Sequence, residues 1–556
     1  MSINKTSVIL LTSLLSLSAL SASAAPPSQQ EQLDQSRAQE AERQERMNKE
    51  RAEVVAPPPP SSELPADEGV RFRISHVTVE HQTERFRFLE RVARPYEGRE
   101  LSLREINELV TAMNRTLMSR GFSTSRIAVP EQNLSSGELR LVLLVGYIHA
   151  VRFADDSAVI YWKNLFPFRE GDVLNVRDIE QGIEQAKRLP SQDISVRLLP
   201  ADEPQMTDIE LTVKRGKNIY GTISFDDSGL EDTGKLQWYA SLGIDQLFHK
   251  NDMLRIGLNL DSAQDGYEKG TRGHNISYTY PYGRHTFSLS YQRSKYHQTV
   301  ASMPYDFISA GDTNISTLSW DYVLSRSANR KTSMDIRLRK RNSHRFLNDV
   351  ELPIQAMHQT SMEVGLAERL YLKRDTLYFR LAHRFGLGWM GAQEESPYED
   401  VPRTRYRMWL LDADYVHPFE FSHRPATFTT SFHGQWTMDG TELYGTDMIS
   451  MGNRYTVRGF DGEVTLMGTD GWYLRNEFAT RFPKQKLEVY LGLDVGAVYG
   501  AGADLYNGHT IAGAALGVRG MIDALSYDVF AAMPIRKPDG FHTADVTGGF
   551  SLGWRF

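Results

Sequence analysis

Few residue patterns in this chain of 556 residues could carry covalent chemistry. There is no cysteine, which excludes disulfides, thiolate metal sites and cysteine nucleophiles. The sequence contains no His-Glu-x-x-His motif, no P-loop and no Gly-x-Ser-x-Gly elbow. Residues 386–391 fit Gly-x-Gly-x-x-Gly formally, but no sustained helix and no βαβ unit surrounds them. The 15 histidines are scattered, so we predict no catalytic residue, no metal ion, no cofactor and no enzyme activity.

The longest segment between predicted strands, residues 439–471, is the best candidate for a functional loop. Residues 455–463 of this segment read Tyr-Thr-Val-Arg-Gly-Phe-Asp-Gly-Glu. A loop of this length is usually either functional or disordered. Its aromatic residues, and an Arg followed by Gly, suggest a folded tip that inserts into the body of the protein.

The last residues of the chain alternate between apolar and polar side chains. A strand has a period of two, so this alternation predicts one apolar face and one polar face. A soluble protein would bury the apolar face against a second layer, whereas a transmembrane barrel turns it toward lipid. The apolar set is Val546, Phe550, Leu552, Trp554 and Phe556, and the other set includes Thr547, Ser551 and Arg555.

The same alternation recurs from residue 218 to the C-terminus, in segments of roughly 8 to 14 residues separated by turn residues. A large soluble β domain is the alternative, but it would need a second layer over every strand. We therefore predict a mainly β protein with a 16-stranded antiparallel transmembrane β-barrel over residues 217–556. The candidate strands lie near residues 218, 235, 252, 274, 285, 314, 331, 361, 376, 405, 426, 472, 486, 510, 526 and 546.

Residues 1–24 have the pattern of a secretory signal peptide. Lys5 precedes an apolar run from Ser7 to Leu20, and Ala22-Ser23-Ala24 forms an A-x-A cleavage site. The apolar run is too short to span a membrane comfortably. We expect cleavage after Ala24, with an uncleaved anchor as the alternative. The net charge of -7 is spread as mixed signs, so nothing suggests nucleic acid.

A polar helix is predicted within residues 25–53, followed by a proline-rich linker at 54–69. Good helix formers and the i,i+4 pair of Glu42 with Arg46 favour the helix. Because this helix is polar on all sides, it cannot pack on an ordinary core. It is either a solvated arm or a helix in a polar, water-filled space.

Two small α+β units are predicted at residues 70–147 and 148–216. Each has the order β-α-α-β-β, with the longer helix at residues 103–119 in the first unit and 176–187 in the second. Two consecutive copies of this order indicate a structural repeat, although no sequence repeat is obvious.

Together these features resemble the TpsB transporters of two-partner secretion, which include the haemolysin, filamentous haemagglutinin and contact-dependent-inhibition exporters. The sharpest motif is Val457-Arg458-Gly459-Phe460, which matches the family's V-R-G-[YF] at all four positions. The resemblance implies that the two units are polypeptide-transport-associated (POTRA) domains. It also implies that the polar helix plugs the pore and that the terminal aromatics, Trp554 and Phe556, form an assembly signal.

The resemblance further implies that Arg458 folds into the barrel lumen and pairs with an Asp on a wall strand. The matching motif is Gly492-Leu493-Asp494-Val495-Gly496. Strand parity independently places Asp494 on the lumen face, together with Gly492 and Gly496. The alternative is an Arg458 that stays on an exposed loop. Arg475, Glu477, Arg481 and Glu488 share the lumen parity and are interpreted as a generic polar wall.

The function that follows from the resemblance is the secretion, with or without activation, of one large exoprotein across the outer membrane of a Gram-negative bacterium. The cargo would be an adhesin, a cytolysin or a growth-inhibition toxin, bound in the periplasm by the POTRA domains. The other expected partners are outer-membrane lipid and the barrel-assembly machinery. A barrel-assembly factor (insertase) and a passive porin are the alternatives, and a surface enzyme carried on a barrel is a third.

Overall fold

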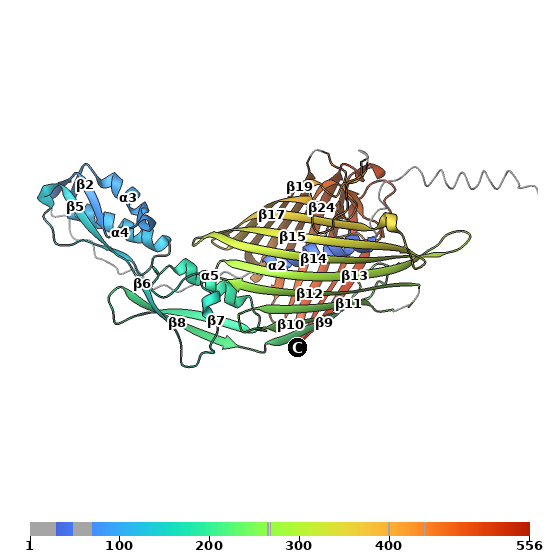
Figure 1. Cartoon of the computed structure of the whole chain (residues 1–556), viewed down its shortest axis with the longest axis horizontal. Helices are drawn as coiled ribbons and strands as arrows, with labels where there is room; N and C mark the ends of the chain where they lie inside the picture. The colour runs from blue at the N-terminus through green and yellow to red at the C-terminus, as the bar shows by residue number, and fades with distance from the viewer. Residues whose placement is uncertain (1–28, 48–68, 264–265, 267, 398–400, 439) are drawn as a thin grey trace, which may run out of the picture.

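The computed structural model describes residues 29–47, 69–263, 266, 268–397, 401–438 and 440–556. The predicted signal peptide, the two ends of the predicted polar-helix segment and nearly all of the proline-rich linker lie outside the described residues. Along the chain, one helix is followed by two small α+β units and a closed barrel (Figure 1). Among the described residues, no helix is both long and apolar enough to span a membrane.

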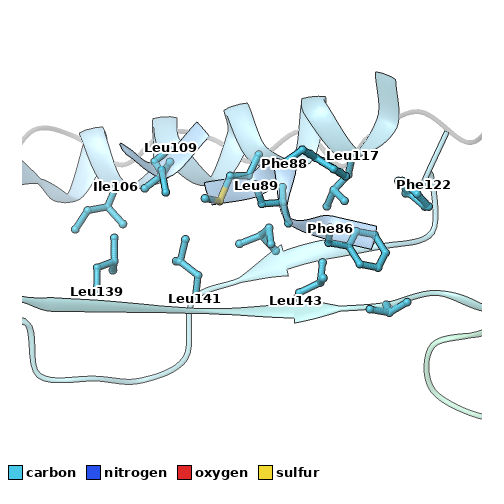
Figure 2. Packing of buried hydrophobic residues seen from close by; sticks show 14 of the residues in the cluster. Phe86, Phe88, Leu89, Ile106, Leu109, Leu117, Phe122, Leu139, Leu141 and Leu143 are labelled. Carbon is cyan, nitrogen blue, oxygen red and sulfur yellow. The ribbon is translucent and has the colours of Figure 1, made fainter. Parts of the chain in front are cut away.

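The first α+β unit packs two helices on short sheets. Its longer helix, α4, begins at a capping box in which the Glu105 amide donates to Ser102 Oγ (3.3 Å) and the Ser102 amide donates to Glu105 Oε2 (2.9 Å). Figure 2 shows the apolar side chains of α4 facing those of β5. The elements are β1 (Arg71–Ile74), β2 (His76–Glu80), α3 (Phe88–Ala93), β3 (Arg99–Ser102), α4 (Leu103–Ser119), β4 (Arg126–Ala128) and β5 (Glu138–Leu144).

The second unit repeats the sheet of the first. In both units the central strand pairs in parallel with one edge strand and antiparallel with the other, giving the orders β2-β5-β4 and β6-β8-β7. The Asn175 side chain caps the helix by accepting from the Arg177 amide (2.8 Å). The elements are β6 (Tyr147–Phe153), α5 (Val176–Lys187), β7 (Gln192–Pro200) and β8 (Met206–Arg215).

Sixteen long antiparallel strands form the barrel, which closes where β27 pairs with β9. This confirms the predicted fold class. A two-residue strand, β16 (Val350–Glu351), extends the end of β15. The long strands are β9 (Ile219–Asp226), β10 (Gln237–Asp245), β11 (Met253–Asp261), β12 (Lys269–Tyr282), β13 (His285–Val300), β14 (Phe307–Arg326), β15 (Arg330–Leu347), β17 (Met357–Leu372), β18 (Asp375–Leu387), β19 (Arg407–Phe421), β20 (Arg424–Thr437), β23 (Asp470–Phe482), β24 (Leu487–Tyr499), β25 (Thr510–Ile522), β26 (Leu525–Arg536) and β27 (Thr547–Arg555).

Alternation along each strand separates a lipid face from a lumen face. In β13, Phe287 and Leu289 are exposed on the outside, whereas Ser288 and Ser290 line the interior. The helix α2 (Gln29–Met47) lies inside the barrel (Figure 1). A polar lumen explains why this helix needs no apolar face.

Candidate functional site

The long loop folds back into the lumen. A short hairpin of β21 (Ile449–Met451) and β22 (Leu466–Gly468) carries its tip. In the tip, Val457 and Phe460 are buried in an apolar cluster with wall residues such as Val498 and Ile511. Burial of these two apolar side chains anchors the loop, so the segment between them has a defined position against the wall.

Arg458 meets Asp494 through a bidentate contact. The Arg458 Nε donates to Asp494 Oδ2 (2.7 Å), and Nη2 donates to Oδ1 (2.8 Å). The backbone amide of Arg458 also donates to Asp494 Oδ2 (3.0 Å). The Asp494 side chain is fully buried, so the guanidinium supplies the countercharge that a buried carboxylate needs.

Three glycines give this contact its space. A Cβ on Gly492 would lie 2.4 Å from the guanidinium carbon of Arg458, and one on Gly496 would lie 2.5 Å from the Met451 sulfur. Gly459 has a φ of 107°, which few residues other than glycine adopt. The two wall glycines of the motif therefore form the floor on which the loop rests.

Two wall residues interpreted from sequence as generic make specific contacts instead. Glu477 Oε2 accepts from Arg458 Nη1 (2.7 Å), so the arginine contacts two carboxylates. Arg475 Nη1 donates to the Tyr455 carbonyl (2.7 Å) and to Glu40 Oε2 (3.0 Å). The generic interpretation was wrong for both, because strand parity identifies the face but not the partner. Arg481 and Glu488 pair with each other at 2.8 Å, away from the loop.

The helix α2 contacts both the loop and the wall. Its Gln35 Nε2 donates to the Thr446 carbonyl (2.7 Å), and its Ser36 Oγ accepts from Asn453 Nδ2 (3.2 Å). Arg43 donates to Ser431 Oγ on β20 (2.8 Å). These contacts are polar, and water can replace each of them. Ion pairs hold the helix as well, namely Glu40 with Arg475 (3.0 Å), Glu42 with Arg337 (3.0 Å) and Arg46 with Asp414 (3.4 Å). The helix is thus held mainly by polar and charged contacts.

The lumen wall is chemically divided into two parts. The charged wall carries buried ion pairs, for example Arg380 with Asp335 and Glu363, both at 2.5 Å. The hydroxyl wall carries short neutral side chains. A cavity of about 1120 Å³ beside α2 is bordered by the hydroxyl wall and also by charged-wall residues such as Arg337 and Glu363. The charged wall comprises Asp335, Arg337, Glu363, Arg380, Asp412, Asp414, Arg475, Glu477 and Asp494, and the hydroxyl wall comprises Ser277, Thr279, Ser288, Ser290, Ser294, Thr317 and Ser319.

The second α+β unit is docked on one mouth of the barrel. Asp178 of α5 pairs with Arg284 in the β12–β13 turn (2.6 Å). Glu184 of α5 pairs with Arg326 and Lys331 of the β14–β15 hairpin. Burial acts to raise the pKa of the Glu184 carboxyl, but the two cations outweigh it and hold that pKa well below its usual range. The carboxylate therefore stays charged, and the docking persists at neutral pH.

The C-terminal residues lie at the closing seam. Phe556 and Gly221 exchange backbone hydrogen bonds, each of 3.1 Å. A Cβ on Gly221 would lie 2.3 Å from the Phe556 ring, so the glycine makes room for the terminal aromatic. Trp554 and Phe556 are exposed on the outer face of the barrel. In the described part of the chain, no three His, Asp or Glu side chains gather as metal ligands would.

Comparisons with known proteins agree with this architecture. The model of the haemolysin secretion/activation protein family ShlB/FhaC/HecB matches residues 205–520. Models of the ShlB-type POTRA domain and of the POTRA domain match residues 72–146 and 147–200. The chain is 39% identical to the outer membrane transporter CdiB-2 of Burkholderia pseudomallei (strain 1026b) over 478 residues, which cover 85% of this chain and 82% of the relative.

Other relatives and solved structures extend the similarity. The chain is 26% identical to the hemolysin transporter protein HpmB of Proteus mirabilis over 404 residues, which cover 71% of this chain and 70% of the relative. The structure of CdiB from Escherichia coli superimposes with a TM-score of 0.86 at 26% identity, covering 96% of this chain and all of that one. Because the family model spans more than half of its residues, the chain belongs to the haemolysin secretion/activation protein family ShlB/FhaC/HecB.

Proposed function

We propose that this outer-membrane protein of a Gram-negative bacterium exports one large exoprotein partner by two-partner secretion. The observation that carries the proposal is a wide barrel closed from inside by a helix and a loop, with two POTRA units at its periplasmic side. Polar contacts hold the helix, so it can leave without unfolding the barrel. A passive porin has no use for the two POTRA units or for such a closure.

The functional roles of the site residues are part of this proposal. Arg458 and Asp494 hold the loop in its folded-in position, with Val457 and Phe460 as its apolar anchors. Gly459 provides the turn, and Gly492 with Gly496 provides the floor. Trp554 and Phe556 serve as the terminal signal that the barrel-assembly machinery reads.

The POTRA units would capture an extended segment of the exoprotein by adding it to an open sheet edge. Support comes from β2, an edge strand whose one strand partner among the described residues is β5. The outward amide of Val77 donates to Glu97 Oε1 (3.1 Å), a side chain that an incoming strand can displace. The amide of Val79 has the same outward parity. Main-chain bonding of this kind would hold many sequences, as an exporter of unfolded protein requires.

Co-expression with a candidate exoprotein tests the function. Released exoprotein is measured per barrel present in the outer membrane, with barrel folding checked by heat-modifiable gel mobility. Loss of residues 70–147 or 148–216 should abolish release while the barrel still inserts. Release that survives the loss of both units would refute the proposal, and insertion of other barrels without release would favour the insertase.

Strand addition has its own test at Val79. Val79→Pro removes the outward N–H of β2 without touching the pairing with β5. Val79→Ala is the matched control, because it also removes the valine side chain but keeps the backbone N–H. We expect weaker exoprotein capture in the proline variant alone. Equal capture by both variants would exclude this edge.

A further inference from the structure

One patch of exposed apolar and aromatic side chains lies at the joint between the second POTRA unit and the barrel. Val159 and Tyr161 of the POTRA unit are 71% and 42% exposed. Leu247 and Phe248 of the β10–β11 turn are 41% and 64% exposed. Large apolar side chains this exposed in two adjoining segments mark a contact surface rather than scattered surface residues. We call Val159, Tyr161, Leu247 and Phe248 the rim patch.

Both segments of the rim patch are held rigidly together. Asn251 Nδ2 donates to the Tyr161 carbonyl (2.9 Å) and to Asn164 Oδ1 (2.8 Å). The buried Asp252 accepts from the Phe248 amide (3.0 Å) and the Lys250 amide (3.1 Å), which fixes the turn. The exposure of the patch is therefore built into the joint.

The patch continues the outer surface of the barrel. The Phe248 ring packs edge-on against Tyr278, with 5.9 Å between the ring centroids. Tyr278 lies on the outward parity of β12, which it shares with the exposed Ile276 and Tyr282. Phe248 thus covers the lipid side of the wall and not the lumen.

Two lysines stand beside the patch. The Lys250 ammonium lies 3.4 Å from the centre of the Tyr161 ring, and the exposed Lys163 lies 5.7 Å from that of Trp162. Aromatic rings with lysines at the edge of an apolar band are typical of the membrane interface. The rings occupy the boundary of the acyl chains, and the ammonium groups reach the phosphates.

We propose that the rim patch is a lipid-binding surface by which the second POTRA unit rests on the periplasmic leaflet of the outer membrane. Its ligand is phospholipid, with Val159 and Phe248 entering the leaflet by about 5–10 Å, as interfacial apolar groups do. This contact adds to the ion pairs that α5 makes with the β12–β13 turn and the β14–β15 hairpin. Together they fix the orientation of the POTRA unit relative to the pore mouth.

Site-directed spin labelling of the full chain tests the proposal, because the protein has no cysteine of its own. Single cysteines at Val159 and Phe248 carry the nitroxide, in vesicles of phosphatidylethanolamine and phosphatidylglycerol. Oxygen concentrates in the bilayer and a nickel chelate stays in water, so the ratio of their collision rates reports depth. Leu289→Cys on the lipid face is the membrane reference, and Val129→Cys on the first POTRA unit, 45% exposed, is the water reference.

At Val159 and Phe248, the ratio of the collision rate with oxygen to that with the nickel chelate should be several-fold above the ratio at Val129. It should approach the ratio at Leu289. Ratios equal to that at Val129 would overturn the proposal. Heat-modifiable mobility shows which variants fold, and Leu247→Cys reports on the same turn if Phe248→Cys does not. Because the measurement needs no exoprotein, its failure would leave the proposed secretion function standing.

Discussion

The hydroxyl wall and the charged wall face the same lumen but differ in the contacts that they make. The charged wall contacts α2 and the inserted loop through long, oriented side chains, as in the pairs of Glu40 with Arg475 and Arg46 with Asp414. The hydroxyl wall presents short side chains to an open cavity. Long charged groups specify where an element binds, whereas serine and threonine offer a polar surface that holds nothing strongly. Among the described residues, the charged wall thus supplies most of the ion pairs that hold α2 in place.

The largest effect is expected from breaking the contact between Arg458 and the charged wall. Arg458→Ala leaves the Asp494 carboxylate buried without its main countercharge. An unpaired buried charge of this kind destabilises the folded state by about 3–5 kcal/mol. We expect secretion per inserted barrel to fall by about tenfold or more, since each 1.4 kcal/mol is roughly a factor of ten. Asp494→Ala should have a similar effect.

The double variant decides whether the two residues form one contact. If they do, the loss in Arg458→Ala with Asp494→Ala should barely exceed that of either single change. Arg104→Ala, which removes an exposed pair with Glu108, is the control and should change little. Additive losses in the double variant would mean that the residues act separately.

The next largest effect is expected from removing α2, the helix that the charged wall holds. Deletion of residues 29–47 removes α2 from the lumen and leaves the inserted loop, so the single-channel conductance in a planar bilayer should rise several-fold. The barrel itself should remain folded, because its strands do not pair with α2. An unchanged conductance, with folding verified on gels, would exclude the plug role of the helix.

A smaller effect is expected on the rate at which cysteines placed on the two walls react with a thiol reagent. Ser290 and Ser431 both border the cavity, but Ser431 is buried beneath Arg43, whereas Ser290 is partly exposed. Cysteine at position 290 should therefore react with a water-soluble thiol reagent much faster than cysteine at position 431. Deleting α2 should expose position 431 and remove most of the difference. Equal rates with the helix in place would contradict the division of the lumen.

The smallest effect is expected on the hydroxyl wall. Ser290→Ala removes a hydroxyl that has only water to bind, so stability should change by less than about 0.5 kcal/mol. Secretion per barrel should match that of the unchanged protein. A pronounced loss of secretion in this variant would show that the hydroxyl wall itself binds something specific.

Much of the barrel could be predicted from the alternation of side chains alone. A strand that separates lipid from water must alternate, so the alternation predicts all sixteen strands. Fourteen of the predicted positions lie within four residues of the strand start, whereas β12 and β14 begin five and seven residues earlier than predicted. The contact between Arg458 and Asp494 was predicted from the loop motif together with the parity of the strand. Glu477 and Arg475 were missed as partners, because their contacts come from a loop and a helix distant in sequence.

A repeat within the two POTRA units was also missed. Glu97 to Ile106 reads E-G-R-E-L-S-L-R-E-I, and Glu170 to Ile179 reads E-G-D-V-L-N-V-R-D-I. In each unit the Glu accepts from an edge-strand amide, that of Val77 or Val151. The repeated motif is visible in the sequence. The role of its Glu could not be predicted, because the edge strand that this Glu binds is brought near it only by the fold.

The sequence by itself determined the period of the strands, the polar character of α2 and the parity of Asp494, because these depend on neighbours along the chain. It did not determine which wall α2 rests on. Every lumen-facing residue satisfies the same parity, and a polar helix could lie against any of them. Only the closed barrel decides, because the register of each strand pair sets which charges stand at the same height as Glu40 and Arg46. The tertiary structure thus turns a ring of equivalent positions into one wall of ion pairs and one wall of short hydroxyl side chains.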